Sequence, residues 1–300
     1  MKLGHIPDVT NEQYHASAGI SKSHLDKIAV SPAHYFAAYL DPEREPRVAT
    51  PAMVQGTAMH TAILEPHLFE TDYIVAPSDL PKKPTAAQRN AKKPSEETIA
   101  ANWAWAAFEE SCVGKTVLTA EQWHVSMMAQ RSVLKHPRAR EILKGVKAEQ
   151  TYYAIDPETG ALGKCRPDGI HVDGWLIDVK STKDASPEAF YRSILDYRYH
   201  VQAPFYHQVL EAALDAAVDR HFEFIAVEKE PPYAVECYVL PAEVWRAGSR
   251  IAAANLQAIV DAKMIGDWHG YTEGLEATEP VFPFWALKKL GCNSAENAFA

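Results

Sequence analysis

Two acids and a lysine in the middle of the chain have the types and spacing needed for chemistry on a phosphate. Residues 175–182, WLIDVKST, alternate between the two faces of a predicted strand, so Asp178 and Lys180 share one face. Asp168 lies on the preceding predicted strand. Neighbouring carboxylates repel each other and therefore favour a cation between them. Oxygen ligands without thiolates suit Mg²⁺ or Mn²⁺ rather than Zn²⁺.

The loop between these strands decides whether the two acids meet. A two-residue loop at 173–174 would pair Asp168 with Val179, on the wrong face. A three-residue loop at 172–174 would set Asp168 opposite Asp178, and the glycine in its third position suits the left-handed conformation such loops need. A bulge just before Asp168 would have the same effect.

These residues predict a site for phosphodiester hydrolysis. A metal between the carboxylates would polarise a phosphate and lower the pKa of a water molecule. Lys180 would orient that water or stabilise charge on the phosphate. The alternative is a solvated ion pair, which is what an isolated acid-x-lysine on a surface strand usually forms. The apolar remainder of the strand and the Pro-Asp-Gly around Asp168 favour the site.

Hydrophobic periodicity predicts an α/β (α+β) architecture in which helices flank a central mixed sheet. Helices are expected as two short elements within 21–40, separated at Ser31-Pro32, and at 51–65, 96–111, 120–144, 187–195, 199–216 and 241–264. Strands are expected at 149–156, 161–172, 175–182, 221–229 and 233–239. We expect one domain over 1–300, with a helical part (1–145), a catalytic core (146–264) and an aromatic, proline-rich tail (265–300).

Composition restricts how this chain can meet nucleic acid. The formal net charge is −9, from 30 basic and 39 acidic residues, so contact with DNA would have to be local. The start lacks the apolar core of a signal peptide, and no apolar run is long enough to span a membrane, so a soluble cytoplasmic protein is expected. The cysteines form no CxxC pair and are expected to be free thiols: Cys112, Cys165, Cys237 and Cys292.

Residues 76–95 are a candidate DNA-binding segment. They contain four prolines, five basic side chains and one acid, Asp79, which predicts a mobile loop. The alternative is a solvated loop that binds nothing. The basic residues are Lys82, Lys83, Arg89, Lys92 and Lys93.

The ordered set H…E…PDG…IDVKST…QxxxY resembles the PD-(D/E)xK nucleases of the RecB type, and more narrowly the C-terminal nuclease domain of the RecE-like exonucleases (exonuclease VIII). The resemblance covers nearly the whole chain, including GISKSHLDKIAVSPAHYF, VQGTAMHTAILEP and WHGY. It implies a restriction-endonuclease-like core. Many RecB-type relatives carry a four-cysteine iron–sulfur cluster; its lack here fits the RecE-like branch.

The resemblance assigns roles to five residues of the candidate site. Asp168 and Asp178 match the metal-binding acids, and Lys180 matches the catalytic lysine. Val179 matches a residue that lends its carbonyl oxygen to the metal. His60 matches a histidine near or on the metal, although its spacing alone favours a core histidine on an apolar helix face.

Three further residues match the pattern and keep a structural alternative. Glu149 matches an acid at the start of the first core strand, or is a surface charge at a strand end. Gln202 and Tyr206 lie on one helical turn and match QxxxY. They would hold the DNA strand or brace the active site, or they form a polar-edged packing face. The tail aromatics are a candidate subunit interface or pack on their own domain: Trp268, Tyr271, Phe282, Phe284 and Trp285.

The resemblance implies a Mg²⁺-dependent exonuclease, for which Mn²⁺ can substitute, that degrades linear double-stranded DNA from its ends, 5′ to 3′. It also implies phage-type homologous recombination, a ring-shaped homo-oligomer and a single-strand annealing recombinase as partner. One alternative is an endonuclease of restriction or repair type, which a long sequence-reading region would favour. The other is a non-catalytic DNA- or protein-binding module, which the intact Asp168, Asp178 and Lys180 disfavour.

Overall fold

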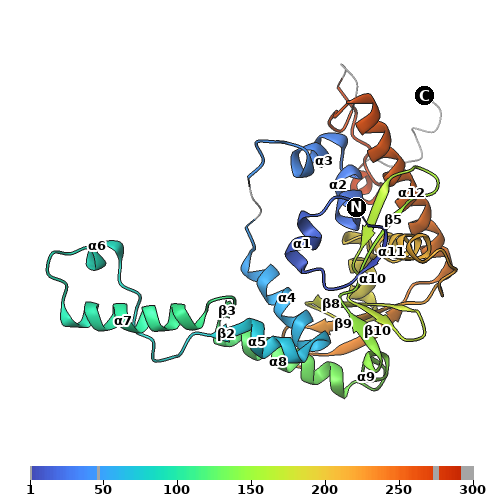
Figure 1. Ribbon diagram of the computed structural model, residues 1–300. Coiled ribbons are helices and arrows are strands. Elements are labelled where there is room, and N and C mark those ends of the chain that lie inside the picture. Colours follow the sequence, from blue (N-terminus) through green and yellow to red (C-terminus); the bar gives the residue numbers. More distant parts are fainter. Residues whose placement is uncertain (1, 46–47, 273–276, 292–300) are drawn as a thin grey trace.

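A five-stranded mixed sheet forms the centre of the computed structural model, which describes residues 2–45, 48–272 and 277–291 (Figure 1). The strand order is β10-β9-β8-β7-β4; β8 and β9 are parallel and the other neighbours antiparallel. The strands are β4 (Val146–Ala148), β7 (Gly169–His171), β8 (Leu176–Thr182), β9 (Phe222–Glu228) and β10 (Val235–Val239). The expected mixed sheet flanked by helices is confirmed.

A second, antiparallel sheet joins β1 (Gly4–Ile6), β5 (Thr151–Ile155) and β6 (Leu162–Cys165). The single strand expected at 161–172 is therefore wrong: the chain leaves β6 at Arg166 and enters β7 in the other sheet. Pro167 lies at this crossing, where it has no ladder hydrogen bond to donate. The strand expected from Glu149 begins at Thr151 instead, because Glu149 has a φ of 53°, outside the extended region.

Helices cover both faces of the central sheet. On one face α4 (Pro51–Leu64), α8 (Ala120–Lys135) and α9 (Pro137–Leu143) pack on Ile177 and Val179 of β8. On the other face α10 (Pro187–Asp196), α11 (Tyr199–Leu214) and α12 (Ala242–Ile265) form the larger core, which includes Leu176. The alternation predicted along β8 is confirmed by this division of its residues between two cores.

Local signals account for most helix boundaries. The helices α2 (Lys22–Ile28) and α3 (Pro32–Tyr39) divide where expected; Ser31 caps α3 by accepting from the His34 N–H at 3.2 Å. The helix expected at 120–144 is two helices, α8 and α9. Pro137 follows the break, and the His136 side chain accepts from the Ala139 N–H at 3.2 Å.

The contact between α11 and α12 depends on a glycine. A Cβ built at Gly248 of α12 would lie 1.6 Å from the carbonyl oxygen of His200 on α11. Two non-bonded atoms cannot approach so closely, so glycine is required for the two helices to cross at this separation. The position of α11 matters because that helix carries Gln202 and Tyr206.

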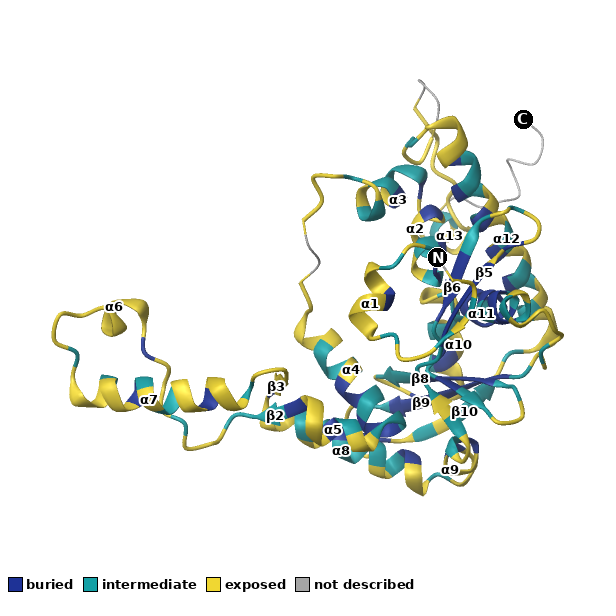
Figure 2. Cartoon of the chain, in the orientation of Figure 1, coloured by how far each residue is buried: buried dark blue, intermediate teal, exposed yellow. Residues whose placement is uncertain are grey.

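An arm, defined here as residues 76–115, extends away from the rest of the molecule (Figure 1). It follows α5 (Pro66–Asp72) and connects β2 (Tyr73–Val75) to β3 (Thr116–Leu118), which pair in parallel. It contains α6 (Ala86–Arg89) and α7 (Glu96–Ser111), and most of its surface is exposed (Figure 2). The loop expected at 76–95 is irregular except for the single turn α6.

The remaining segments are α1 (Asn11–Ala16) and α13 (Phe284–Lys289). Of the tail aromatics, Trp268 stacks on Tyr35 of the same chain with ring centroids 5.7 Å apart, whereas Phe284 and Trp285 are exposed. Within the described residues, no helix has the length and apolar character required to cross a bilayer. The thiols expected to be free are free at Cys112, Cys165 and Cys237, and Cys292 lies outside the described residues.

Candidate active site

The hairpin from β7 to β8 sets Asp168 opposite Asp178. Ile170 pairs with Leu176, and the His171 N–H donates to the Trp175 carbonyl at 2.9 Å. The loop is therefore the three-residue alternative, 172–174, and Gly174 has the left-handed φ of 90° that such a loop needs. Gly169 pairs with Ile177, and the next pair in the same register is Asp168 and Asp178.

The backbone of Val179 faces the same edge as Asp168. Leu176 and Thr182 bond through their main chains to His221 and Lys229, which directly flank β9. Alternate residues of β8 therefore turn their N–H and C=O groups to β9, and the residues between them turn to β7. Val179 belongs to the second set, and its N–H donates to Asp168 Oδ2 at 2.7 Å. Its carbonyl oxygen therefore points past the end of β7, toward the edge where Asp168 lies.

Lys180, Asp178 and Gln202 form a closed polar triad. Lys180 Nζ lies 2.5 Å from Asp178 Oδ1 and donates to Gln202 Oε1 at 2.9 Å, and the Gln202 amide donates to Asp178 Oδ2. The ring of Tyr199 lies 4.3 Å from Nζ. Burial acts to lower the pKa of Lys180, but Asp178, Tyr199 and Asp168 together outweigh it and the pKa is raised, so the ammonium stays charged.

His60 reaches the site from α4. Its Nδ1 lies 3.3 Å from Asp168 Oδ2. Burial lowers the pKa of His60, so the imidazole is neutral near pH 7, the form that binds metals. The buried face of α4 consists of Ala58, Met59, Ala62 and Ile63, and His60 lies off that face. The structure thus brings His60 to the acids and does not place it in the core.

Glu149 adds a third carboxylate beside Asp168. Its backbone N–H donates to the Asp168 carbonyl at 3.1 Å, and its Oε2 accepts from Arg166 Nε at 2.5 Å. Burial, followed by the charge of Asp168, raises the pKa of Glu149 to about 7. Arg166 also donates to the carbonyl of Val9 at 2.5 Å, which ties the N-terminal segment to the site. Sequence reasoning did not identify Arg166, although it directly precedes the Pro-Asp-Gly.

The site has the donors for a divalent cation, although its carboxylates face other partners. Across the described parts of the chain, no three His, Cys, Asp or Glu side chains converge as a ready cluster of metal ligands. Asp178 pairs with Lys180 and Glu149 with Arg166 instead. Burial and the charge of Asp178 raise the pKa of Asp168, a repulsion that a cation would relieve.

One carboxylate oxygen that is ion-paired but not hydrogen-bonded supports this fit. Asp178 Oδ1 is buried and accepts no hydrogen bond of acceptable geometry, even with the Lys180 ammonium nearby. Opposed carboxylates, a carbonyl oxygen and a neutral imidazole suit Mg²⁺ or Mn²⁺.

The other predicted residues divide between the site and the arm. Tyr206 is half-buried on α11; burial, then Tyr14 and Asp178, raises the pKa of its hydroxyl. The basic residues of 76–95 lie on the arm, which extends away from β8, so this conformation does not bring them to the acids (Figure 1). Lys83 forms an ion pair with Glu109 at 2.6 Å.

Comparisons with known proteins agree with this geometry. Residues 21–279 match the family described as the PDDEXK-like domain of unknown function (DUF3799). The chain belongs to this DUF3799 family. Its fold is similar to a crystal structure described as a "Putative exonuclease" from Eubacterium rectale, with a TM-score of 0.56 and 10% identity, over 94% of this chain and 98% of that one. No curated protein matches the chain. The PD-(D/E)xK superfamily expected from the sequence is confirmed, and the RecE-like branch stays a prediction.

Proposed function

We propose that this DUF3799 protein is a metal-dependent exonuclease that degrades linear double-stranded DNA, 5′ to 3′, in phage-type homologous recombination. The observation that carries the proposal is the register of the β7–β8 hairpin, which sets Asp168 opposite Asp178 with Lys180 beside them. The family membership and the described activity of the similar structure support it.

In this proposal each residue of the site has a distinct task. Asp168, Asp178 and the Val179 carbonyl would hold the cation, with His60 and Glu149 at its border. When bound, Mg²⁺ supplies Lewis acidity toward the phosphate, and Mn²⁺ can replace it. Lys180, held charged by Asp178, donates to a phosphate oxygen on which negative charge develops. Gln202 keeps Asp178 and Lys180 in one geometry by bonding to both.

The proposal includes a ring-shaped homo-oligomer and a single-strand annealing partner. A chain with a net charge of −9 is repelled by DNA at long range, yet an exonuclease must stay on its track through many cleavages. A closed ring retains a threaded end without strong electrostatic affinity, and cyclic closure is the usual outcome of a symmetric assembly. Sedimentation at a mass several times 33.3 kDa would support it, and a monomer would contradict it.

Digestion of matched DNA forms tests the proposed activity. Linear duplex and covalently closed circles of one plasmid are incubated with a Mg²⁺ or Mn²⁺ titration and with EDTA, and 5′-labelled ends report polarity. We expect metal-dependent loss of the linear form while closed circles survive. Lys180→Ala should reduce the rate by about 10²- to 10³-fold. Lys183→Ala, an exposed lysine three residues away, is the matched control.

The other outcomes assign other functions. Cleavage of closed circles would favour the restriction- or repair-type endonuclease. Binding of DNA without cleavage under any metal would favour the non-catalytic module. Full activity in excess EDTA would exclude the metal site.

A further inference from the structure

An exposed tyrosine is stacked against the wall of the candidate active site. Tyr197 lies at the junction between α10 and α11, and its side chain is 62% exposed. Its ring stacks on Tyr199 with centroids 5.6 Å apart and an interplanar angle of 21°. Tyr199 also contacts Lys180, whose Nζ lies 4.3 Å from the ring centroid. Two aromatic rings thus lead from solvent to the lysine of the site.

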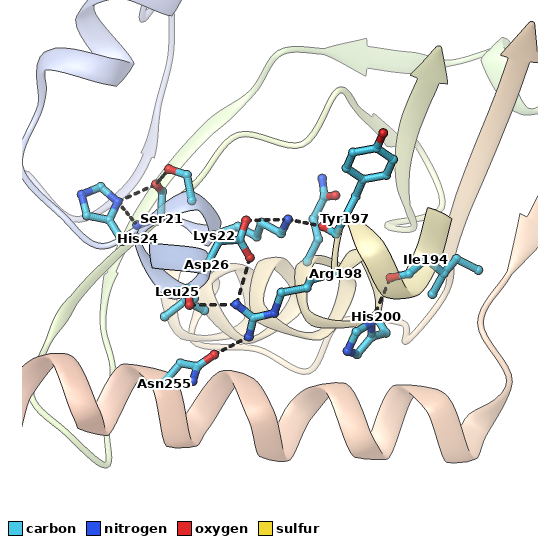
Figure 3. Close-up of polar contacts among 12 residues, drawn as sticks. Ser21, Lys22, His24, Leu25, Asp26, Ile194, Tyr197, Arg198, His200 and Asn255 are labelled. Atoms are coloured by element: carbon cyan, nitrogen blue, oxygen red, sulfur yellow. Dashed lines mark hydrogen bonds and ion pairs between the residues drawn. The ribbon is translucent and has the colours of Figure 1, made fainter. Parts of the chain in front are cut away.

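A partly buried polar network holds this junction in place (Figure 3). Lys22 of α2 donates to the Tyr197 carbonyl at 2.5 Å and pairs with Asp26 at 2.7 Å. Arg198, in a left-handed conformation with φ of 55°, donates to Asn255 of α12 and pairs with Asp26 at 3.2 Å. Figure 3 shows the Tyr197 ring directed away from these contacts. The ring is therefore presented on a backbone anchored to two helices.

The surroundings suit an anionic strand with aromatic bases. Lys22 and Lys180 flank the tyrosine pair and are close enough that Lys180 contributes to lowering the pKa of Lys22, after burial and against the opposing effect of Asp26. Exposed aromatic rings next to cations are the common means of binding single strands, since every base has a face that stacks. Pre-anchoring the ring reduces the ordering cost of binding.

The geometry also restricts which DNA can use the ring. Inside a duplex both faces of a base are covered by its neighbours, so a protein ring can stack on a base only at an end or after unpairing. We infer that Tyr197 stacks on the base next to the phosphate engaged by Lys180, so that the strand is unpaired where it is cut. This inference rests on the proposed function, and Lys22 and Arg198 serve in it as positioning residues.

Abasic substrates test the stack directly. Wild type, Tyr197→Ala and Tyr197→Phe are compared on linear duplexes with a normal or an abasic nucleotide next to the cleaved bond, with KM and kcat measured separately. We expect Tyr197→Ala to raise KM by about 5- to 150-fold on the normal end, the size of one base–aromatic stack. The abasic end should remove this difference, and Tyr197→Phe should behave as wild type. Tyr271→Ala, which removes a tyrosine that is 78% exposed and lies beside His34, is the control.

Two results would overturn the inference. An equal loss on normal and abasic ends would assign Tyr197 a structural role, and a wild-type KM in Tyr197→Ala would exclude any contact. Anisotropy of a fluorescent single strand in EDTA keeps the inference separate from the proposed activity. If the wild type binds the strand more tightly than Tyr197→Ala there but cuts no DNA, the activity fails while the stack stands.

Discussion

Two lysine–carboxylate pairs of nearly equal length occupy very different surroundings. Lys180 and Asp178 are 2.5 Å apart in the candidate site, with side chains 16% and 2% exposed. Lys83 and Glu109 are 2.6 Å apart on the arm, with side chains 49% and 57% exposed. Solvent competes for the second pair and not for the first. The length of a pair therefore says little about its importance, whereas burial decides whether removing one partner leaves an uncompensated charge.

The largest contrast should come from removing the acid of each pair. Asp178→Ala is expected to abolish DNA degradation and to lower the free energy of unfolding by about 3–5 kcal/mol, since it strands the Lys180 charge. Asp168→Ala should instead ease folding without metal, because burial and the charge of Asp178 raise the pKa of Asp168. Glu109→Ala should leave both activity and unfolding unchanged. Urea unfolding and digestion of linear DNA measure the contrast, and equal effects in the two pairs would contradict it.

The next effect concerns pH and the metal-free protein. The pKa of Glu149 is raised to about 7 from an ordinary 4.5. Between these values the folded state binds a proton that the unfolded state has released, so stability falls as pH rises from 4.5 to 7. The fall is at most about 3.5 kcal/mol at about 1.4 kcal/mol per pKa unit. Asp168 acts in the same direction, because its pKa is also raised.

Glu149→Gln should remove part of this pH dependence. Unfolding at pH 5 and pH 8 in EDTA measures it, and added Mg²⁺ should reduce the fall in the wild type, because a cation favours the ionised carboxylates. A variant with the wild-type profile would mean that Glu149 is solvated.

A third prediction contrasts packing in the two regions. Gly248→Ala should lower the free energy of unfolding by about 1–3 kcal/mol or more, since its Cβ would overlap the His200 carbonyl. The variant should also have a lower kcat, because α11, which carries Gln202, must shift to make room for the new methyl group. Trp103→Ala removes a large side chain from the arm that is 75% exposed, and should change stability by less than about 0.5 kcal/mol. Thermal melts and kcat measurements decide between these expectations.

The smallest effect is expected from the exposed charges of the arm. Neutralising Lys82, Arg89, Lys92 and Lys93 should leave kcat unchanged and reduce the salt dependence of DNA affinity, by about one unit of slope for each phosphate that the arm no longer neutralises. Lys83→Ala is tested separately because Lys83 already pairs with Glu109. A slope identical to that of the wild type would identify the arm as a solvated segment without a role in DNA binding.

The sequence predicted the parts of the site that depend on local patterns. Alternation along WLIDVKST placed Asp178 and Lys180 on one face. Gly174 suited the third position of a three-residue loop at 172–174, so the observed hairpin was one of the two loop lengths considered. The three-residue strands β1, β2, β3 and β4 were not expected, because an alternation needs more length to be recognised. The break at His136-Pro137 did have a local signal, the proline, which a continuous helical pattern outweighed.

The remaining features depend on interactions between distant segments. Arg166 binds Glu149 and the Val9 carbonyl, which no pattern within the RPDG segment predicts. Gln202 could have held DNA or braced the site; its two bonds to Asp178 and Lys180 arise because α11 packs against β8. The basic residues of the arm are solvated, so the packing of the protein does not show what they do. A solvated charge has a function only when a ligand binds to it.

The parallel pairing of β2 and β3 limits how the arm can vary in length. Parallel strands cannot be joined by a tight turn, because the chain must return to the starting end of its neighbour, and such crossovers need about a dozen residues or more. The arm is that crossover for Tyr73–Val75 and Thr116–Leu118. Its helices could be deleted or replaced as a cassette without disturbing the strands, whereas trimming it to a short turn would unpair them. The arm can therefore become longer, but it cannot become shorter than the crossover that joins two parallel strands.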